Sequence, residues 1–451
     1  MINKERAFKI LKTALFYSGA DMTEAVLENE RLSLTRFAES KIHQSIDRDE
    51  TVLYVKAVRD KKIGVIATGD ISIEGIKKAV IDCEEMLKFM VPDERFISIP
   101  DKDPAPLKEN FISQGTVQLD AGQRAEAVRT ITEIGSSSNL EASGAFRVER
   151  RHVAVMTSRG MKRYYEGNHG QLSLTLSGTE DNSGWAMAYG TDASTIDASS
   201  LALTAAEKAM QSYKPVSLPD GKYTVILEPA AVGQLLLMLS FMGFGGKSFY
   251  QHRSFMAGKI GEKIAGDNFT VYEDPRDESF GIMPFDYEGV ARRRVPLIAN
   301  GYARGVVYDS YYANLAGTQS TGHALPPTNA YGPYPKALSI AAGKSSLDEM
   351  IMSTDYGILI THFWYLNFLN PMMTMVTGTT RDGTFLIENG TITSAVRNMR
   401  TNQSILKAFS NIEMISEDRI LYPQYGVLMK IPAMKINEFD LAAEEEDEDK
   451  C

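Results

Sequence analysis

The chain has 451 residues, 43% hydrophobic and 24% charged, a composition typical of a globular protein with more than one core. Its net charge of -10 comes mostly from residues 438–450, which hold eight acidic residues and one lysine, so we expect a disordered acidic tail over 438–451. The near-neutral remainder argues against direct nucleic-acid binding. There is no apolar run long enough for a membrane span, no signal-peptide pattern and only two cysteines, so we expect a cytoplasmic protein without membrane contact.

The first 218 residues repeat one order of elements: a helix, alternating strands and a second helix. The first pass covers 1–90, the second covers 111–218, and a proline-rich connector over 91–110 separates them. Within the first pass, "RDKKIG" reads as a hairpin turn, and a serine followed by a glutamate reads as a helix start. We therefore predict an N-terminal domain that could contain two subdomains.

A second domain is predicted from 219 to 437. The break "KPVSLPDGKY" at 214–223 contains two prolines and a glycine, and the residues after it are rich in glycine, proline and strand-forming residues. The predicted fold class is α+β. It combines an N-terminal domain of repeated helix–antiparallel meander–helix units with a strand-rich C-terminal domain.

The junction "KYTVILEPAAVGQLLLML" predicts a strand that leads directly into a helix. Pro229 suits the first helical position, and Glu228 suits the positive end of the helix dipole. The helix is apolar on all sides, which is typical of a buried helix. The stretch contains no His, Cys or Ser, so local rules account for it without chemistry.

Four stretches of the second half resemble the TldD/PmbA family, peptidases also known as modulators of DNA gyrase. The resemblance covers nearly the whole chain to about residue 437, and the most specific stretch is "PFDYEGVARRRVPLIANGYARGVVYDSYYA" at 284–313. The other stretches are "SFMAGKIGEKIA", "STGHALPPTNAY" and "TFLIENGTI".

The family resemblance implies a degenerate metal site. In the TldD branch this junction carries His-Glu-three residues-His, with a distant Cys as a further zinc ligand. Alignment on the shared Ala-Val-Gly places Pro229 and Ala230 at the His-Glu pair and Gln234 at the second His, and 375–385 has no Cys. The chain therefore resembles the PmbA branch, also called TldE. We expect no catalytic residues, no metal ligands and no cofactor in this chain, with zinc in a TldD-like partner.

Other residues are candidates for contact or catalytic sites. His323 and Asn329, in "STGHALPPTN", are candidates for substrate or partner contact, and Arg381 is a candidate for holding a peptide carboxylate. Asp286 and Glu288 could anchor a cation, although solvation or pairing with nearby arginines is the simpler interpretation. Ser183 lacks the neighbours of a serine nucleophile. The aromatic and methionine-rich stretch 361–376 reads as core or as a subunit interface.

These features favour a subunit of a zinc metallopeptidase assembly that is itself catalytically silent. It would pair with a TldD-like subunit, or with itself when alone, and help to hold an unfolded peptide as an added strand. The alternatives are a non-catalytic regulator that binds DNA gyrase or another protein, and an autonomous hydrolase whose residues assemble only in space.

Overall fold

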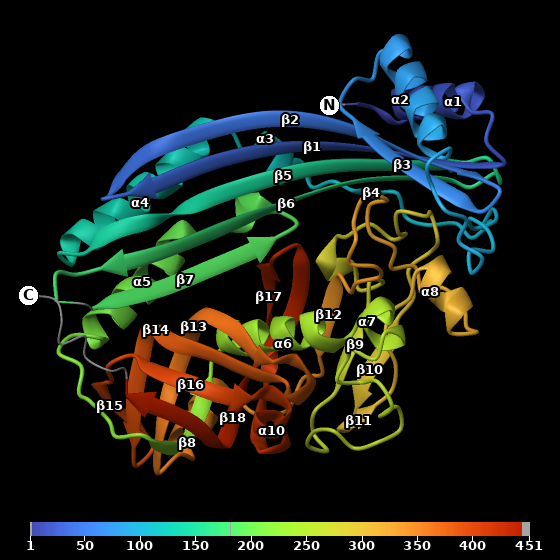
Figure 1. Cartoon of the computed structure of the whole chain (residues 1–451). Helices are drawn as coiled ribbons and strands as arrows, with labels where there is room; N and C mark the ends of the chain where they lie inside the picture. Colours follow the sequence, from blue (N-terminus) through green and yellow to red (C-terminus); the bar gives the residue numbers. More distant parts are fainter. Residues whose placement is uncertain (1, 181, 444–451) are drawn as a thin grey trace, which may run out of the picture.

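The computed structural model describes residues 2–180 and 182–443 as two domains, each built around its own β-sheet. In Figure 1 the long N-terminal sheet arches over the C-terminal domain. The α+β fold class is confirmed, with helices and largely antiparallel sheets in both halves. Within the described ranges, no helix has the length and apolar character required to cross a membrane.

The N-terminal sheet has seven strands in the order β3-β2-β1-β5-β6-β4, with β7 also paired to β6. The strands are β1 (Met22–Ala38), β2 (Lys41–Arg59), β3 (Lys62–Thr68), β4 (Asn110–Phe111), β5 (Glu141–Thr157), β6 (Lys162–Ser177) and β7 (Ser183–Gly190). β1 pairs with β5 along most of its length, so the two helix–meander–helix units share one continuous sheet. The possible subdomains 1–90 and 111–218 are thus halves of one structure.

Most helices of this domain lie toward the two ends of the arch, α1 and α2 at one end and α4 and α5 toward the other (Figure 1). They are α1 (Lys4–Tyr17), α2 (Ile73–Met86), α3 (Gln114–Gln118), α4 (Ala121–Ser137) and α5 (Ala198–Gln211). α1 and α2 share one apolar core with the first unit's strands, while α4 and α5 share another with the second unit's. Side-chain caps fix the helix starts: the Ser72 hydroxyl accepts from the Gly75 amide, and Asp120 forms a capping box with Gln123.

The C-terminal sheet has eleven strands, five of which close on themselves. The pairing runs β18-β16-β14-β13-β8 and returns from β8 to β18, so these five have no free edge between them. The strands of the sheet are β8 (Gly221–Leu227), β9 (Val271–Glu273), β10 (Val295–Ala299), β11 (Tyr302–Ala303), β12 (Ala337–Ile340), β13 (Tyr356–Asn370), β14 (Met375–Glu388), β15 (Thr391–Ala395), β16 (Met399–Ser404), β17 (Ile412–Gln424) and β18 (Val427–Ala443).

Helix α6 lies at the centre of the C-terminal core. Thirteen of its fifteen residues are buried, and it packs against β13, β17 and β18. This burial matches the apolar character of the segment on every side. The helices of this domain are α6 (Pro229–Gly243), α7 (Gly246–Tyr250), α8 (Ser310–Leu315), α9 (Leu347–Met352) and α10 (Ile405–Ser410).

The segment that follows residue 283 joins the two domains. Phe285 and Tyr287 are buried in an apolar cluster with Val26, Val153 and other residues of the N-terminal sheet. The Tyr287 hydroxyl also donates to the Glu28 carboxylate of β1 at 3.0 Å. The most specific stretch of the family resemblance therefore begins with residues that hold the N-terminal sheet on the C-terminal domain.

The C-terminal boundary moves relative to the sequence prediction. β18 continues to Ala443, and the Ala443 amide donates to the Asp220 carboxylate at 2.8 Å. Residues 438–443, assigned to the acidic tail from charge alone, are thus part of a strand because the closed sheet supplies their hydrogen bonds. The remainder of the predicted tail, 444–451, lies outside the described residues.

Candidate functional site at the start of helix α6

The start of α6 is held by an ion pair between the domains. β8 ends at Leu227, and Glu228 then adopts an extended conformation before Pro229 begins the helix. The Glu228 carboxylate caps no amide of the helix, and instead accepts from the Lys208 ammonium of α5 at 2.5 Å. Both side chains are mostly buried, so this pair ties the helix start to the N-terminal domain.

Gln234 is bound to the main chain of β13 through both ends of its amide. Its Nε2 donates to the Phe363 carbonyl at 2.9 Å, and its Oε1 accepts from the Phe363 amide at 2.7 Å. The residue is 9% exposed, and β13 has register shifts on either side of Phe363. Gln234 thus satisfies main-chain groups where the regular ladder is interrupted.

A polar cluster that the sequence did not reveal lies next to this contact. His362 of β13 forms a hydrogen bond from Nε2 to Asp382 of β14 at 2.9 Å, and the Ser183 hydroxyl of β7 donates to the same carboxylate at 2.6 Å. Trp185 of β7 lies against the His362 ring with centroids 4.9 Å apart. His362 and Asp382 lie on neighbouring strands, but Ser183 and Trp185 come from the other domain, so no local spacing could have predicted the cluster.

This cluster joins the domains and does not have the order of a catalytic triad. The Asp382 carboxylate lies between Ser183 and His362, so the imidazole contacts the carboxylate and not the hydroxyl. Burial acts to raise the pKa of Asp382, but the hydrogen bonds from His362 and Ser183 outweigh it and leave that pKa below its usual value. Asp382 therefore remains an acceptor for both partners.

The three predicted contact residues lie in different environments. His323 is completely buried, with Nε2 3.2 Å from Glu273 and Nδ1 2.9 Å from the Thr321 hydroxyl, so contact with a ligand would require this interior to open. Asn329 is exposed and lines a cavity of about 250 Å³ between the domains. The structure does not bring these two together with Arg381.

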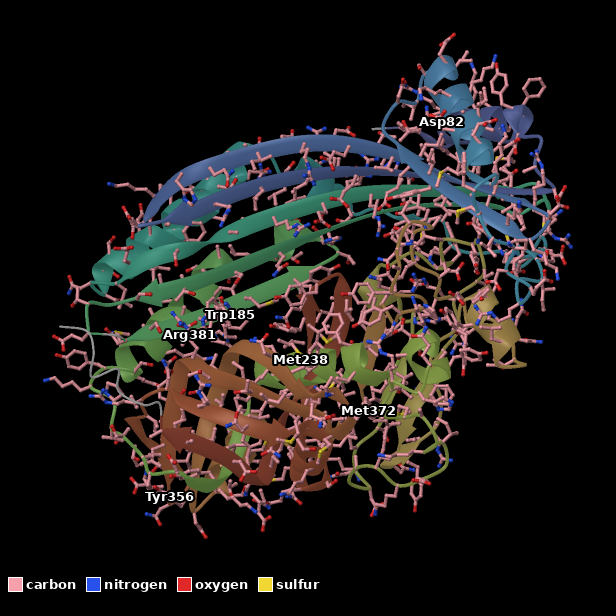
Figure 2. All side chains as sticks on the ribbon, viewed as in Figure 1. Asp82, Trp185, Met238, Tyr356, Met372 and Arg381 are labelled. Carbon is pink, nitrogen blue, oxygen red and sulfur yellow. The ribbon has the colours of Figure 1, made fainter. Side chains whose placement is uncertain are left out.

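Arg381 lies on the face of the C-terminal domain that meets β7. Figure 2 shows it close to Trp185. Its guanidinium lies 4.7 Å from the centre of the Trp364 ring, and its side chain is about half exposed. The guanidinium thus forms a cation–π contact, while about half of the side chain remains accessible to solvent.

The stretch 361–376 is buried at both ends and largely exposed between them. Phe363 is 1% exposed, whereas Tyr365 is 75% and Met373 is 64% exposed. Further exposed apolar residues of this hairpin are Trp364, Phe368, Leu369 and Met372. We call these six exposed residues of 364–373 the hairpin patch. Apolar side chains gathered on one hairpin are typical of a binding surface.

Comparison with known proteins identifies the family. Residues 220–443 match the family model described as the PmbA/TldA metallopeptidase C-terminal domain. The chain belongs to the PmbA/TldD family. A Metalloprotease TldD homolog of Buchnera aphidicola is 28% identical over 217 residues, which are 47% of this chain and 44% of that protein, so the match spans less than half of that relative.

Two further PmbA/TldD relatives extend over nearly the whole chain. A Metalloprotease PmbA homolog of Haemophilus influenzae is 23% identical over 89% of this chain and 88% of its own length. The crystal structure of TldE from Thermococcus kodakarensis superposes with a TM-score of 0.87, at 23% identity, over 97% of this chain and 100% of that one. This PmbA/TldD chain thus has the TldE fold in both domains.

The zinc that the PmbA/TldD family implies does not fit the residues at the start of α6. Pro229 and Ala230 have no ligand atoms in their side chains, and both ends of the Gln234 amide are already bound to Phe363. A neutral amide oxygen is also a poor zinc ligand compared with imidazole or thiolate. Elsewhere in residues 2–180 and 182–443, no three His, Cys, Asp or Glu side chains are grouped so as to hold a metal ion.

Proposed function

We propose that this chain is the PmbA/TldE-type subunit of a metallopeptidase assembly that acts on unfolded peptides, with zinc and the general base supplied by a TldD-like partner. The observation that carries the proposal is the double hydrogen bond between Gln234 and Phe363. The family resemblance places a zinc ligand at this position. Here the side chain instead holds helix α6 on strand β13, so we assign it a structural role and no role in metal binding.

The hairpin patch supports partner binding. It begins directly after Phe363, so it continues from the strand residue that holds Gln234. Aromatic and methionine side chains are enriched in the cores of protein interfaces, and both kinds are present here. We propose that a TldD-like subunit covers this patch, and that a second copy of this chain covers it when the partner is absent.

The test uses the purified chain, a TldD-like zinc subunit and their mixture. We expect the chain alone to leave an unfolded peptide intact, and the mixture to form a stable complex that cleaves it. Met373→Glu places a charge in the hairpin patch and should weaken the complex while the chain remains folded. Met352→Glu is the matched control, because Met352 is 66% exposed on α9, outside the patch.

Two results would contradict this proposal. One is chelator-sensitive cleavage of the peptide by the isolated chain, which would make it an autonomous peptidase. The other is retention of gyrase without any TldD-like protein in a pull-down with the wild-type chain, which would favour the regulator. Equal complex formation by the Met373 and Met352 variants would reject the hairpin patch as the interface.

A further inference from the structure

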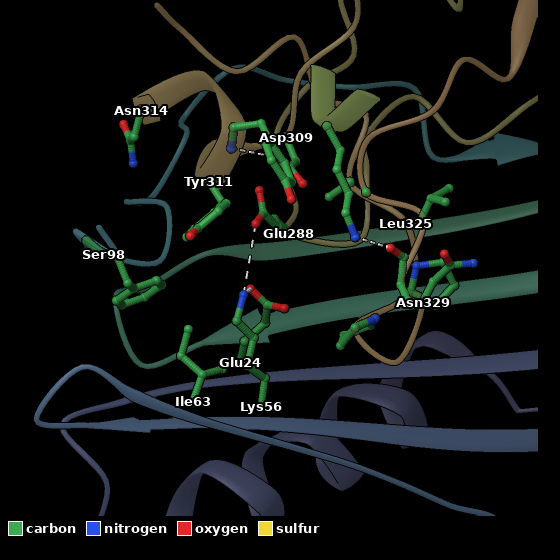
Figure 3. A pocket seen from close by; sticks show the side chains of 18 of the residues that line it. Glu24, Lys56, Ile63, Ser98, Glu288, Asp309, Tyr311, Asn314, Leu325 and Asn329 are labelled. Carbon is green, nitrogen blue, oxygen red and sulfur yellow. Dashed lines mark hydrogen bonds and ion pairs between the residues drawn. The ribbon is translucent and has the colours of Figure 1, made fainter. Parts of the chain in front are cut away.

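A polar cavity of about 250 Å³ lies at the seam between the two domains (Figure 3). Glu24 and Lys56 of the N-terminal sheet form one wall, and Glu288 and Asp309 of the C-terminal domain form another. The connector 91–110 closes a third side through residues 96–98. The cavity is thus built from both domains and the connector, and it is separate from the start of α6.

Three carboxylates in this cavity face one central ammonium. Glu24 and Lys56 are directly opposite each other on β1 and β2. The Lys56 Nζ lies 4.0 Å from Glu24 Oε2 and 4.0 Å from Glu288 Oε1, too far for a hydrogen bond to either. Lys56 therefore neutralises part of the cluster without satisfying its acceptors.

Glu24 is the group that points to a ligand. It is 1% exposed, and its Oε2 has no hydrogen-bond partner among the described residues. A buried carboxylate oxygen without a partner carries a large desolvation cost, which a bound donor would offset. Burial raises the pKa of Glu24 to about 7, although the nearby Lys56 ammonium acts to lower it, and burial together with Glu288 raises the pKa of Asp309 to about 7.

The other two carboxylates and the second ammonium group of the wall already have structural partners. Glu288 Oε2 accepts from the Ser310 amide at 3.0 Å, and Asp309 Oδ1 accepts from the Tyr312 amide at 2.7 Å. Lys247, the second ammonium in the wall, donates to the Ala330 carbonyl. Once Glu24 and Asp309 have lost their protons, three carboxylates and two ammonium groups leave the wall one positive charge short of balance. One ammonium group placed among the carboxylates restores that balance.

Apolar side chains complete the lining and limit the kind of cation. Phe96, Tyr311 and Tyr312 present aromatic surface beside the carboxylates. A short alkyl chain suits that surface, and an ammonium group suits carboxylates and aromatic rings together. The described carboxylates are not arranged to coordinate a metal ion. We propose that this cavity binds a primary ammonium group on a short alkyl chain, carried by a free diamine or by a peptide lysine side chain.

Calorimetry on the full wild-type chain tests this proposal with four probes. They are 1,5-diaminopentane, a lysine blocked at both ends, the neutral 1,5-pentanediol, and magnesium chloride. We expect one or both amines to bind, and neither the diol nor magnesium to do so. Binding of the diamine alone would identify the ligand as a small free amine. Binding of the blocked lysine would identify it as a peptide lysine side chain. Both amines should bind more tightly at pH 8 than at pH 6, because Glu24 and Asp309 must lose their protons.

Glu24→Gln is the decisive variant. It keeps the size of the side chain but removes the charge, so amine affinity should fall by about tenfold or more. Glu30→Gln, on the same strand and outside the cavity lining, should bind the amines within about twofold of wild type. Equal amine binding by Glu24→Gln, no amine binding by the wild-type chain, or magnesium binding that depends on Glu24 would each overturn the proposal.

Discussion

Replacement of Gln234 by methionine tests whether this side chain serves structure. Methionine is similar in volume, but it forms neither of the two hydrogen bonds to Phe363. The substitution leaves the Phe363 amide without this partner in the interior, and leaves its carbonyl with the His362 Nδ1 contact at 3.1 Å. Each lost bond of this kind costs about 1–3 kcal/mol, so Gln234→Met should lower the free energy of unfolding by roughly 2–5 kcal/mol. For a domain of this size, the loss corresponds to a fall in Tm of roughly 5–15 °C.

Thermal unfolding followed by circular dichroism measures this change. Gln211→Met is the matched control, because Gln211 is exposed on α5 and bonds only a neighbouring glutamate, so its Tm should stay close to wild type. Gln234→Glu keeps the acceptor for the Phe363 amide but loses the donor, and should also unfold at a lower temperature. A Gln234→Met variant with the wild-type Tm would refute the structural role assigned to this residue.

Three further substitutions test other parts of the structure. Gly184→Ala should lower the free energy of unfolding by about 1–3 kcal/mol or more in chemical denaturation, because its Cβ would lie 2.0 Å from the Ala205 carbonyl oxygen; Gly190→Ala, with 3.4 Å to its nearest atom, should be tolerated. The pKa of Glu24 rises on folding from 4.5 to about 7, so its contribution to stability is complete at low pH and is lost as the pH rises through this range. Glu24→Gln is neutral throughout, so at pH 8 its free energy of unfolding should exceed that of the wild type by roughly 1–3 kcal/mol, with a higher Tm. Near pH 4 the two proteins should have the same Tm. The pKa of Asp382 is lowered on folding, so its contribution is present at neutral pH and is lost in acid; Asp382→Asn should cost about 1–3 kcal/mol at pH 7, and less below pH 4, as shown by Tm against pH.

Local features of the fold could be predicted because they depend on neighbouring residues. The "RDKKIG" turn joins β2 to β3 with Asp60 and Lys61 at φ of 49° and 59°, as a two-residue hairpin requires. The cap at Ser72 likewise sets a helix start at the predicted serine. The union of the two N-terminal units in one sheet could not be predicted, because alternation shows that a strand has a buried face but does not name its partner.

The chemistry of buried polar residues was hardest to predict. Solvation or pairing with nearby arginines is the simpler interpretation of Asp286 and Glu288 from the sequence. In the structure they lie in a turn covered by the N-terminal sheet and are 0% and 8% exposed, so solvation is wrong. The Asp286 carboxylate accepts from the amides of Glu288, Val290 and Ala324. The glycine and proline neighbours of His323 predict a loop, in which this histidine either contacts a substrate or partner or forms a loop hydrogen bond; the structure shows the loop hydrogen bond, to Thr321, in a buried site. Such neighbours indicate irregular backbone, and they carry no information on what covers it.

The central claim is that the zinc of the assembly is not held by this chain. Elemental analysis of the purified chain, of a TldD-like subunit and of their complex measures it most directly. We predict far less than one zinc per molecule in the isolated chain, and about one zinc per pair of subunits in the complex. About one tightly bound zinc in the isolated chain, together with peptide cleavage that a chelator abolishes, would contradict the account.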